Sequence, residues 1–205
     1  MAPPRCGACA EPAAAADPLC STCWSKICVG PPGRAVLAIA GPVSWGAPYD
    51  GAARRALTAL KFGGRTRLAL PLGALTAAAC HDLAADRTVI AVPPARRRLR
   101  ARGFDSAALI AAEVARHLDL PLAACLRRLD GRRQVGRPRA ERLASPPRVV
   151  VAGPVPAHAL LVDDVLTTGA TLSACADALV EAGCVTVVAA TFARSFGETR
   201  RPAYH

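Results

Sequence analysis

The sequence predicts an α/β fold with a parallel sheet flanked by helices, preceded by a small N-terminal zinc ribbon. Short apolar runs alternate with helices or loops along most of the chain, and this alternation favours crossover connections between parallel strands. Two Cys-x-x-Cys pairs precede all of these runs, in a stretch too small for a core of its own. At 205 residues and 52% hydrophobic content, the chain can bury one main core, and the composition excludes disorder.

Four cysteines near the N-terminus are spaced as metal ligands. They are Cys6, Cys9, Cys20 and Cys23. Four thiolates at this spacing can close a tetrahedral site, so we expect structural Zn²⁺ in a segment over residues 1–34. A redox pair or unconnected thiols are the alternatives. Cys28 lies close enough in the chain to substitute for one ligand.

The rest of the chain, residues 35–205, is expected to form one domain. Apolar spacing predicts a linking strand over 35–43, a helical segment over 51–83, and helices over Ser106–Leu118 and 170–182. The strands of the parallel sheet are expected at 88–92, 148–152, 158–162 and 185–192. The tail after Arg194 has no assignment.

Positive charge is concentrated in one window. The chain has a formal charge of +11, and residues 94–142 hold thirteen arginines against five acids. A local field of this kind suits a polyphosphate or a nucleic acid, and a solvated face in an arginine-biased sequence is the simpler alternative. The window contains a basic loop over 96–102 that leads into a helix, and a second, mobile basic loop over 127–142.

Other function classes are disfavoured by composition. Aromatic residues make up only 4% of the chain, which argues against extensive base stacking, and Phe62 and Phe104 beside the basic loops are expected to pack rather than stack. The N-terminus does not resemble a signal peptide, and the most apolar helical stretch, 68–80, is too short to span a bilayer. We therefore expect a cytoplasmic protein with no membrane span.

The most informative part of the chain is an apolar run that ends in two carboxylates and a hydroxyl-rich turn. Asp163 and Asp164 follow the run at 158–162. Carboxylates accept hydrogen bonds from ribose hydroxyls and favour a nearby cation, whereas a glycine-containing turn before a helix N-terminus suits a monophosphate. Together they predict a site for a ribose 5-phosphate, the alternative being that these residues only cap the next helix. The turn residues are Thr167, Thr168, Gly169, Ala170 and Thr171.

This motif, from Val162 to Thr171, resembles the phosphoribosyl pyrophosphate (PRPP) binding motif of type I phosphoribosyltransferases. The resemblance implies a type I phosphoribosyltransferase-like sheet with the acid pair on the ribose hydroxyls and the turn on the 5-phosphate. The order of segments along nearly the whole chain resembles the ComF family more narrowly. That family comprises zinc-ribbon, phosphoribosyltransferase-like proteins associated with DNA uptake in naturally transformable bacteria. The segments that carry this resemblance are the cysteine pairs, Tyr49 with Lys61-Phe62-Gly63-Gly64, Arg102-Gly103-Phe104, and Arg128 with Gln134 and Arg142.

The resemblance implies a phosphoribosyltransferase, a glycosyltransferase that binds PRPP with Mg²⁺ or a phosphoribosyl nucleotide. Asp163 and Asp164 are the expected catalytic residues, because they would position the ribose while a nitrogen nucleophile from a base or an amine attacks C1; no residue is an obvious general base. The family usually continues Arg-Gly-Phe with Asn-Gln, where this chain has Asp105-Ser106. The residues expected to face the pyrophosphate or to close over the site are Arg96, Arg97, Arg98, Arg100, Arg102, Arg128 and Arg142.

A non-catalytic accessory protein is the competing class. In this alternative the basic window contacts single-stranded DNA, or the zinc segment docks a partner such as a DNA-uptake helicase, and the phosphosugar site is regulatory or vestigial. Folds of this type host both enzymes and regulators, so the fold does not decide between them.

Overall fold

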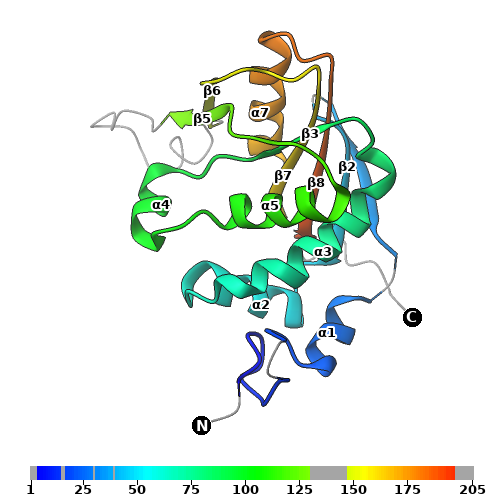
Figure 1. Cartoon of the computed structure of the whole chain (residues 1–205), viewed down its shortest axis with the longest axis vertical. Helices are drawn as coiled ribbons and strands as arrows, with labels where there is room; N and C mark the ends of the chain where they lie inside the picture. Colours follow the sequence, from blue (N-terminus) through cyan, green and yellow to red (C-terminus); the bar gives the residue numbers. More distant parts are fainter. Residues whose placement is uncertain (1–3, 15–16, 30, 39, 130–146, 197–205) are drawn as a thin grey trace.

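A six-stranded sheet forms the centre of the molecule (Figure 1). The computed structural model describes residues 4–14, 17–29, 31–38, 40–129 and 147–196. Neighbouring strands pair in parallel except at the edge, where β1 runs antiparallel to β2, so the expected α/β fold is confirmed. The strand order is β1 (Gly33–Leu37), β2 (Gly41–Pro48), β8 (Thr186–Arg194), β7 (His158–Leu166), β3 (Thr88–Ala91) and β4 (Leu122–Ala123).

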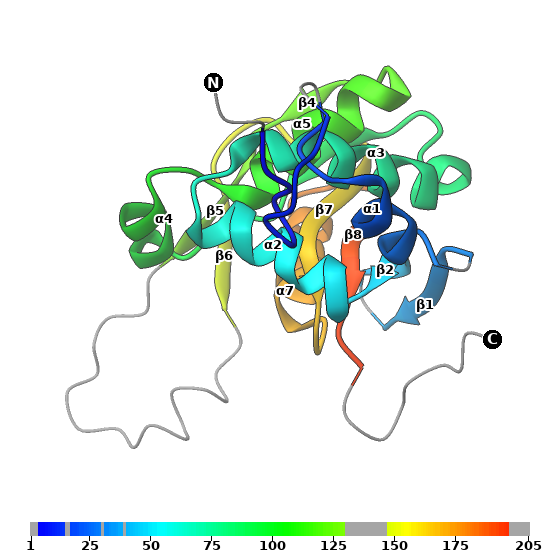
Figure 2. The same ribbon diagram turned by 90° about the horizontal axis from the view of Figure 1, so that it is seen from below.

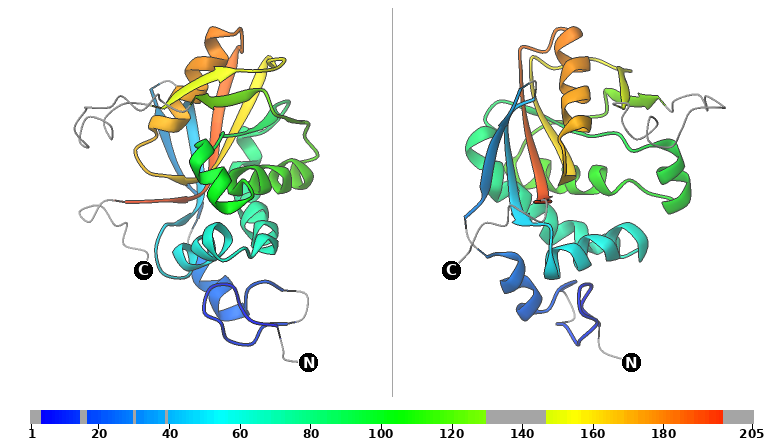
Figure 3. Two further views of the ribbon diagram at one scale, coloured as in Figure 1. Left: turned by 90° about the vertical axis from the view of Figure 1, so that its left-hand side faces the viewer. Right: turned by 180° about the vertical axis from the view of Figure 1, so that it is seen from behind.

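Helices cover both faces of this sheet (Figure 3). On one face α3 (Ala69–Cys80) and α5 (Ser106–Leu118) pack on the strands, and on the other face lies α7 (Ala170–Glu181). Because both faces are covered, the central strands are buried on both sides and read as continuous apolar runs rather than alternating ones. The first half of β7 shows this, since Ala159 to Val162 are fully buried.

The N-terminal segment packs on the helical layer. Its helix α1 (Ser21–Ile27) lies against α2 (Gly51–Phe62), and the loop before it crosses α2 when the molecule is seen from below (Figure 2). Two hydrogen bonds attach it, from Arg55 Nε to the Ala8 carbonyl at 2.9 Å and from Arg65 Nη1 to the Arg5 carbonyl at 2.9 Å. The predicted helical segment over 51–83 comprises α2, α3 and two 3-10 turns, η1 (Thr66–Leu68) and η2 (His81–Leu83).

Two predictions about strands were wrong. The single linking strand over 35–43 is a hairpin, because the chain reverses between β1 and β2 and Gly41 adopts a positive φ of 61° that glycine tolerates. The strand over 148–152 does not join the main sheet. As β6 (Arg148–Val151) it pairs antiparallel with β5 (Leu126–Leu129), a segment that the sequence placed in a mobile loop.

Two further boundaries differ from the prediction. The basic stretch 96–102 is a short helix, α4 (Arg96–Arg102), which ends at Gly103 in the left-handed conformation. Strand β7 does not stop at Val162 but continues to Leu166, because its backbone stays paired with β8 and the Leu166 side chain is buried in the core beneath α7. The acid pair therefore lies within a strand rather than in a turn.

Candidate functional site

The carboxylate of Asp164 is held at the centre of the site by two hydrogen-bond donors. The Lys61 ammonium, at the end of α2, lies 2.7 Å from Asp164 Oδ1, and Ser106 Oγ, at the start of α5, donates to Asp164 Oδ2 at 2.9 Å. The two charged side chains are only 16% and 15% exposed, so solvent screens this ion pair weakly. The ion pair and the Ser106 hydrogen bond together fix the carboxyl end of β7 relative to α2 and α5.

Asp163 is the less satisfied carboxylate of the two. Its Oδ1 accepts a hydrogen bond from the Asp164 amide at 2.7 Å. Burial and, second, the neighbouring charge of Asp164 raise the pKa of Asp163 to about 7, although the Asp164 amide and Lys61 oppose the shift. A bound cation or a hydroxyl donor would favour the charged form of this group.

The hydroxyl-rich turn lies directly beyond the acid pair. Gly169 adopts a φ of 80°, α7 begins at Ala170, and the Thr168 hydroxyl accepts a hydrogen bond from the Ala170 amide at 3.4 Å. Asp163 and this turn line one small hollow of about 20 Å³. Neither carboxylate caps α7, because the acid pair lies inside β7, so the alternative in which these carboxylates only cap the helix does not describe the structure.

A larger cavity of about 770 Å³ is lined by Lys61, the residue that pairs with Asp164. Lys61 and Phe62 from the end of α2 line one wall, and three arginines of α4 line the opposite wall. The guanidinium carbon of Arg102 lies 4.7 Å from the centre of the Phe62 ring, so a cation–π contact bridges the two walls. Phe62 is 72% exposed, contrary to the expectation that it packs; Phe104 is partly buried against the core as expected.

The helical form of α4 divides the arginines that the sequence treated as one set. Arg97, Arg98 and Arg102 line the cavity, whereas Arg100 does not. Arg128 is partly buried on β5, and its charge acts on the Cys175 thiol of α7. Arg142 and most of the second basic loop lie outside the described residues.

Sequence reasoning missed two side chains that contact the acid pair. Lys61 is one of only two lysines in a chain that otherwise uses arginine, and that exception was the available signal. Ser106 was noted only as a departure from the ComF pattern. Its hydroxyl reaches Asp164, while the Asp105 carboxylate caps α5 by accepting from the amides of Ala107 and Ala108 at 3.0 and 3.2 Å.

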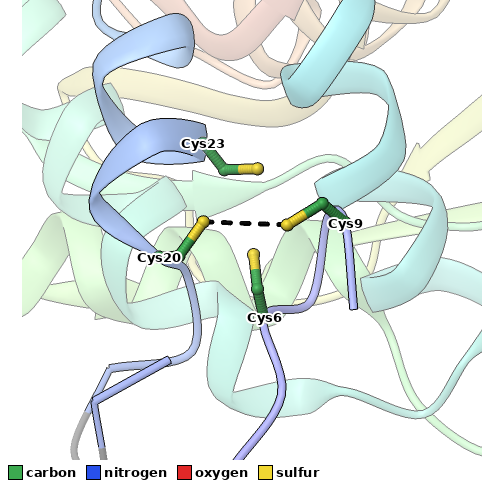
Figure 4. A group of neighbouring side chains, drawn as sticks. All are labelled: Cys6, Cys9, Cys20 and Cys23. Carbon is green, nitrogen blue, oxygen red and sulfur yellow. Dashed lines mark hydrogen bonds between the residues drawn. The ribbon is translucent and has the colours of Figure 1, made fainter. Parts of the chain in front are cut away.

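The four N-terminal cysteines converge. Their sulfur atoms lie within 4.8 Å of one another, with Cys9 Sγ and Cys20 Sγ 3.7 Å apart, and the side chains point to one centre (Figure 4). Two come from the first loop and two from the start of α1. This donor set fits a tetrahedral Zn²⁺ site of the closed, structural type.

The thiols of this cluster have strongly divergent acidities. Burial raises the pKa of Cys6, but hydrogen bonds outweigh that effect and lower it to about 6. Burial and the neighbouring thiols raise the pKa of Cys23 to about 12. Thiols that share protons in this way favour replacement of those protons by a metal. Cys28 is exposed at the end of α1 and does not belong to the cluster.

The fold and the site define a class: an α/β protein in which an acid pair and a threonine-glycine turn meet at the carboxyl end of a central strand. Residues 105–205 match the family model of the phosphoribosyl transferase domain. Among the described residues, no helix has the length and apolarity needed to cross a membrane.

Solved structures of two enzymes are weakly similar. One is described as the allosteric regulatory enzyme of purine biosynthesis, with a TM-score of 0.43, 20% identity and coverage of 60% of this chain and 26% of that chain. The other is orotate phosphoribosyltransferase from Aeropyrum pernix, with a TM-score of 0.39, 19% identity and coverage of 83% and 89%. This chain thus spans about a quarter of the length of the first enzyme. No curated protein sequence matches the chain.

Proposed function

We propose that this protein binds PRPP with Mg²⁺ and transfers the phosphoribosyl group to a nitrogen nucleophile. One observation carries the proposal: Asp163 and four residues of the turn line the same hollow at the carboxyl end of β7, namely Thr167, Gly169, Ala170 and Thr171. An anion in the turn would meet backbone amides at the start of α7, and ribose hydroxyls would reach the acid pair. The phosphoribosyl transferase domain match over residues 105–205 supports this assignment.

The residues of the chain would act mainly by position and charge. Asp163 and Asp164 accept hydrogen bonds from the ribose hydroxyls, and their negative charge stabilises the positive charge that develops on the ring as the C1–O bond breaks. Lys61 orients the Asp164 carboxylate through their ion pair. Arg97, Arg98 and Arg102 line the cavity beside Lys61, and their positive charge would stabilise the departing pyrophosphate.

Mg²⁺ fits this site by the chemistry of its donors. Burial and the charge of Asp164 raise the pKa of Asp163 to about 7, because they disfavour a second negative charge there. Oxygen donors with excess negative charge are the ligand environment that Mg²⁺ prefers. When bound, the ion would neutralise charge on the pyrophosphate.

Calorimetric titration with PRPP and Mg²⁺ tests the proposal. The zinc-loaded wild type should bind PRPP, and the Asp163→Asn/Asp164→Asn variant should lose that binding at matched salt. Asp82→Asn is the matched control, because Asp82 is an exposed carboxylate paired with Arg34, outside the site. Absence of PRPP binding by the folded wild type would overturn the proposal.

We further propose that the protein is ComF-like and has a role in DNA uptake. It rests on the resemblance and on the four-cysteine cluster attached to α2. We assign residues 1–34 to the zinc ribbon, in which that cluster would hold Zn²⁺, and 35–205 to the phosphoribosyltransferase-like domain. A pulldown of uptake helicase with and without residues 1–34 tests whether this segment docks a partner.

Binding of single-stranded DNA is the second candidate. Arg97, Arg98 and Arg100 are exposed on α4 and have no ion-pair partner within the described part of the chain, so they are available to phosphates. An affinity for oligo(dT) that falls steeply with salt and is indifferent to Asp163→Asn would favour this candidate. An affinity that is negligible at low salt would exclude it.

A further inference from the structure

The cavity between α2 and α4 is distinct from the hollow at the turn from Thr167 to Thr171. It shares no lining residue with that hollow, and Lys61 connects the two through its ion pair with Asp164. All of its lining residues precede residue 105, so they lie outside the segment that matches the phosphoribosyl transferase domain. The match to that domain therefore does not indicate what this cavity binds, and its ligand has to be inferred from the residues that line it.

Aromatic side chains gather in this cavity. The chain has two Trp, two Tyr and four Phe, and three of these eight residues, Tyr49, Phe62 and Phe104, line it. The Phe62 ring does not belong to either hydrophobic core and is 72% exposed, so burial does not explain its position. Exposed rings that face a cavity offer stacking surfaces for a planar ligand.

The charge of the cavity is positive. Arg97 and Arg98 have no ion-pair partner within the described part of the chain, and none of the lining residues is acidic. Three guanidinium groups therefore line this cavity without a neutralising carboxylate among its described lining residues. A cationic amine would be repelled, whereas an anionic group would be attracted.

The cavity also offers no side chain that would take a proton from an acceptor. No carboxylate or histidine is among its lining residues in the described chain, and the Asp164 carboxylate beside it is engaged by Lys61 and Ser106. An acceptor that reacts here needs a nitrogen with a free lone pair and no proton to lose. A pyridine-type ring nitrogen meets this condition.

We propose that this cavity binds the acceptor, and that the acceptor is an aromatic nitrogen heterocycle carrying a carboxylate. The proposal rests on the proposed phosphoribosyl transfer. The ring stacks against Phe62 and its neighbours, and the carboxylate pairs with Arg97 and Arg98. The lone pair of the ring nitrogen forms the bond to C1 of the ribose, while the C1–O bond breaks and its electron pair leaves with the pyrophosphate; the positive charge then resides on the ring.

Matched pairs of probes test this chemistry on the full-length, zinc-loaded protein. Nicotinate and nicotinamide share one ring, and quinoline-3-carboxylate and its carboxamide share a larger one, so each pair differs in charge alone. Titration followed by saturation-transfer NMR should show about tenfold tighter binding of at least one carboxylate than of its carboxamide. Failure of both carboxylates to bind, or equal binding of acid and amide, would overturn the proposal.

Variants separate the ring contact from the charge contact. Phe62→Leu should weaken both members of a pair about fivefold, and Arg97→Gln/Arg98→Gln should remove the preference for the acid. Arg116→Gln is the control, because Arg116 is an exposed arginine paired with Glu113 towards the far end of α5. Unchanged carboxylate binding in both cavity variants would overturn the proposal, as would its displacement by oligo(dT), which would assign the cavity to single-stranded DNA.

PRPP calorimetry on the same samples distinguishes a failure of the acceptor assignment from a failure of the proposed phosphoribosyl transfer. Carboxylate binding without any PRPP binding would overturn the proposed transfer and support an aromatic-anion site of another function. PRPP binding without carboxylate binding would overturn the acceptor assignment and leave PRPP binding supported.

Discussion

Lys61 shows how one side chain links an ion pair to the architecture of the site. The chain uses arginine almost everywhere, and a lysine stands where a compact, single-point cation meets Asp164 at 2.7 Å. The planar guanidinium of arginine presents a fork of donors on a longer side chain, so it is not an equivalent partner in a confined space. The exception in the composition therefore marks a contact within the candidate site.

Replacing Lys61 should destabilise the protein through the charge left behind. In Lys61→Met the partly buried Asp164 carboxylate loses its only cation at hydrogen-bonding distance in the described chain, and we expect the free energy of unfolding to fall by about 1–3 kcal/mol. Urea denaturation measures this. The double variant Lys61→Met/Asp164→Asn should recover part of the loss, and a loss that simply adds to that of Asp164→Asn would contradict the pairing.

Asp163 should make stability depend on pH. Its pKa is raised from the usual value near 4 to about 7, so the folded protein binds this proton more tightly than the unfolded chain. Stability contributed by the protonated carboxyl is therefore lost as pH rises from about 4 to about 7, and the curve is flat above. We expect the difference in unfolding free energy between wild type and Asp163→Asn to fall by roughly 1–4 kcal/mol over that interval.

Asp82 provides a control of opposite sign. The hydrogen bond from Arg34 lowers its pKa, so its contribution is present at neutral pH and is lost on acidification. Asp82→Asn should therefore alter the pH profile only in the acid range. A wild-type profile parallel to that of Asp163→Asn between pH 4 and 7 would show that the Asp163 proton is not retained on folding.

At the scale of elements, the turn between β7 and α7 depends on one glycine. Gly169 has a φ of 80°, and a Cβ there would lie 2.9 Å from the Leu37 side chain. Gly169→Ala should lower the free energy of unfolding by about 1–2 kcal/mol and also weaken PRPP binding, because the turn that faces the 5-phosphate must shift.

Gly183 provides a control in which an added Cβ strains the backbone but leaves the turn between β7 and α7 intact. It has a φ of 99° just after α7, with no atom within 4 Å of an added Cβ. Gly183→Ala should cost a similar amount of stability, measured by thermal unfolding, and leave PRPP affinity unchanged. Equal loss of PRPP affinity in the two variants would mean that general destabilisation, not the turn, controls binding.

The sequence predicted those elements whose limits are set locally. Helix α5 was located correctly because Asp105 caps it, and the apolar start of β7 was recognised because both faces of the sheet are covered. Long-range pairing set the rest. The extension of β7 to Leu166 follows from its pairing with β8, and the separate sheet of β6 follows from its pairing with β5, so neither was visible in a local pattern.

The candidate site divides in the same way. The acid pair and its turn are contiguous in the chain, so they could be recognised by type and order. Lys61 and Ser106 reach Asp164 from helices 103 and 58 positions away in sequence, and only the fold brings them there. Sequence reasoning thus recognised the acid pair and its turn and missed the two side chains that hold Asp164 in place.

At the scale of the whole molecule, α2 connects the cysteine cluster to the candidate site. Near its middle, Arg55 binds the Ala8 carbonyl between the paired cysteines, and at its end Lys61 binds Asp164. Both ends of this connection are polar contacts at short distance. A disturbance of the metal cluster can therefore reach the acid pair through a single helix.

Metal content and PRPP affinity should accordingly fall together. Cys23→Ser removes one of the four converging thiols, and we expect it to lose most bound Zn²⁺, to unfold at a lower temperature and to bind PRPP more weakly because Lys61 is less well placed. Cys28→Ser is the matched control, since Cys28 lies outside the cluster and should retain about one Zn²⁺ per chain. Plasma emission spectrometry, thermal unfolding and calorimetry measure the three quantities. Loss of zinc from Cys28→Ser would place that thiol among the ligands, and full PRPP affinity in metal-free Cys23→Ser would show that α2 holds Lys61 without help from the cluster.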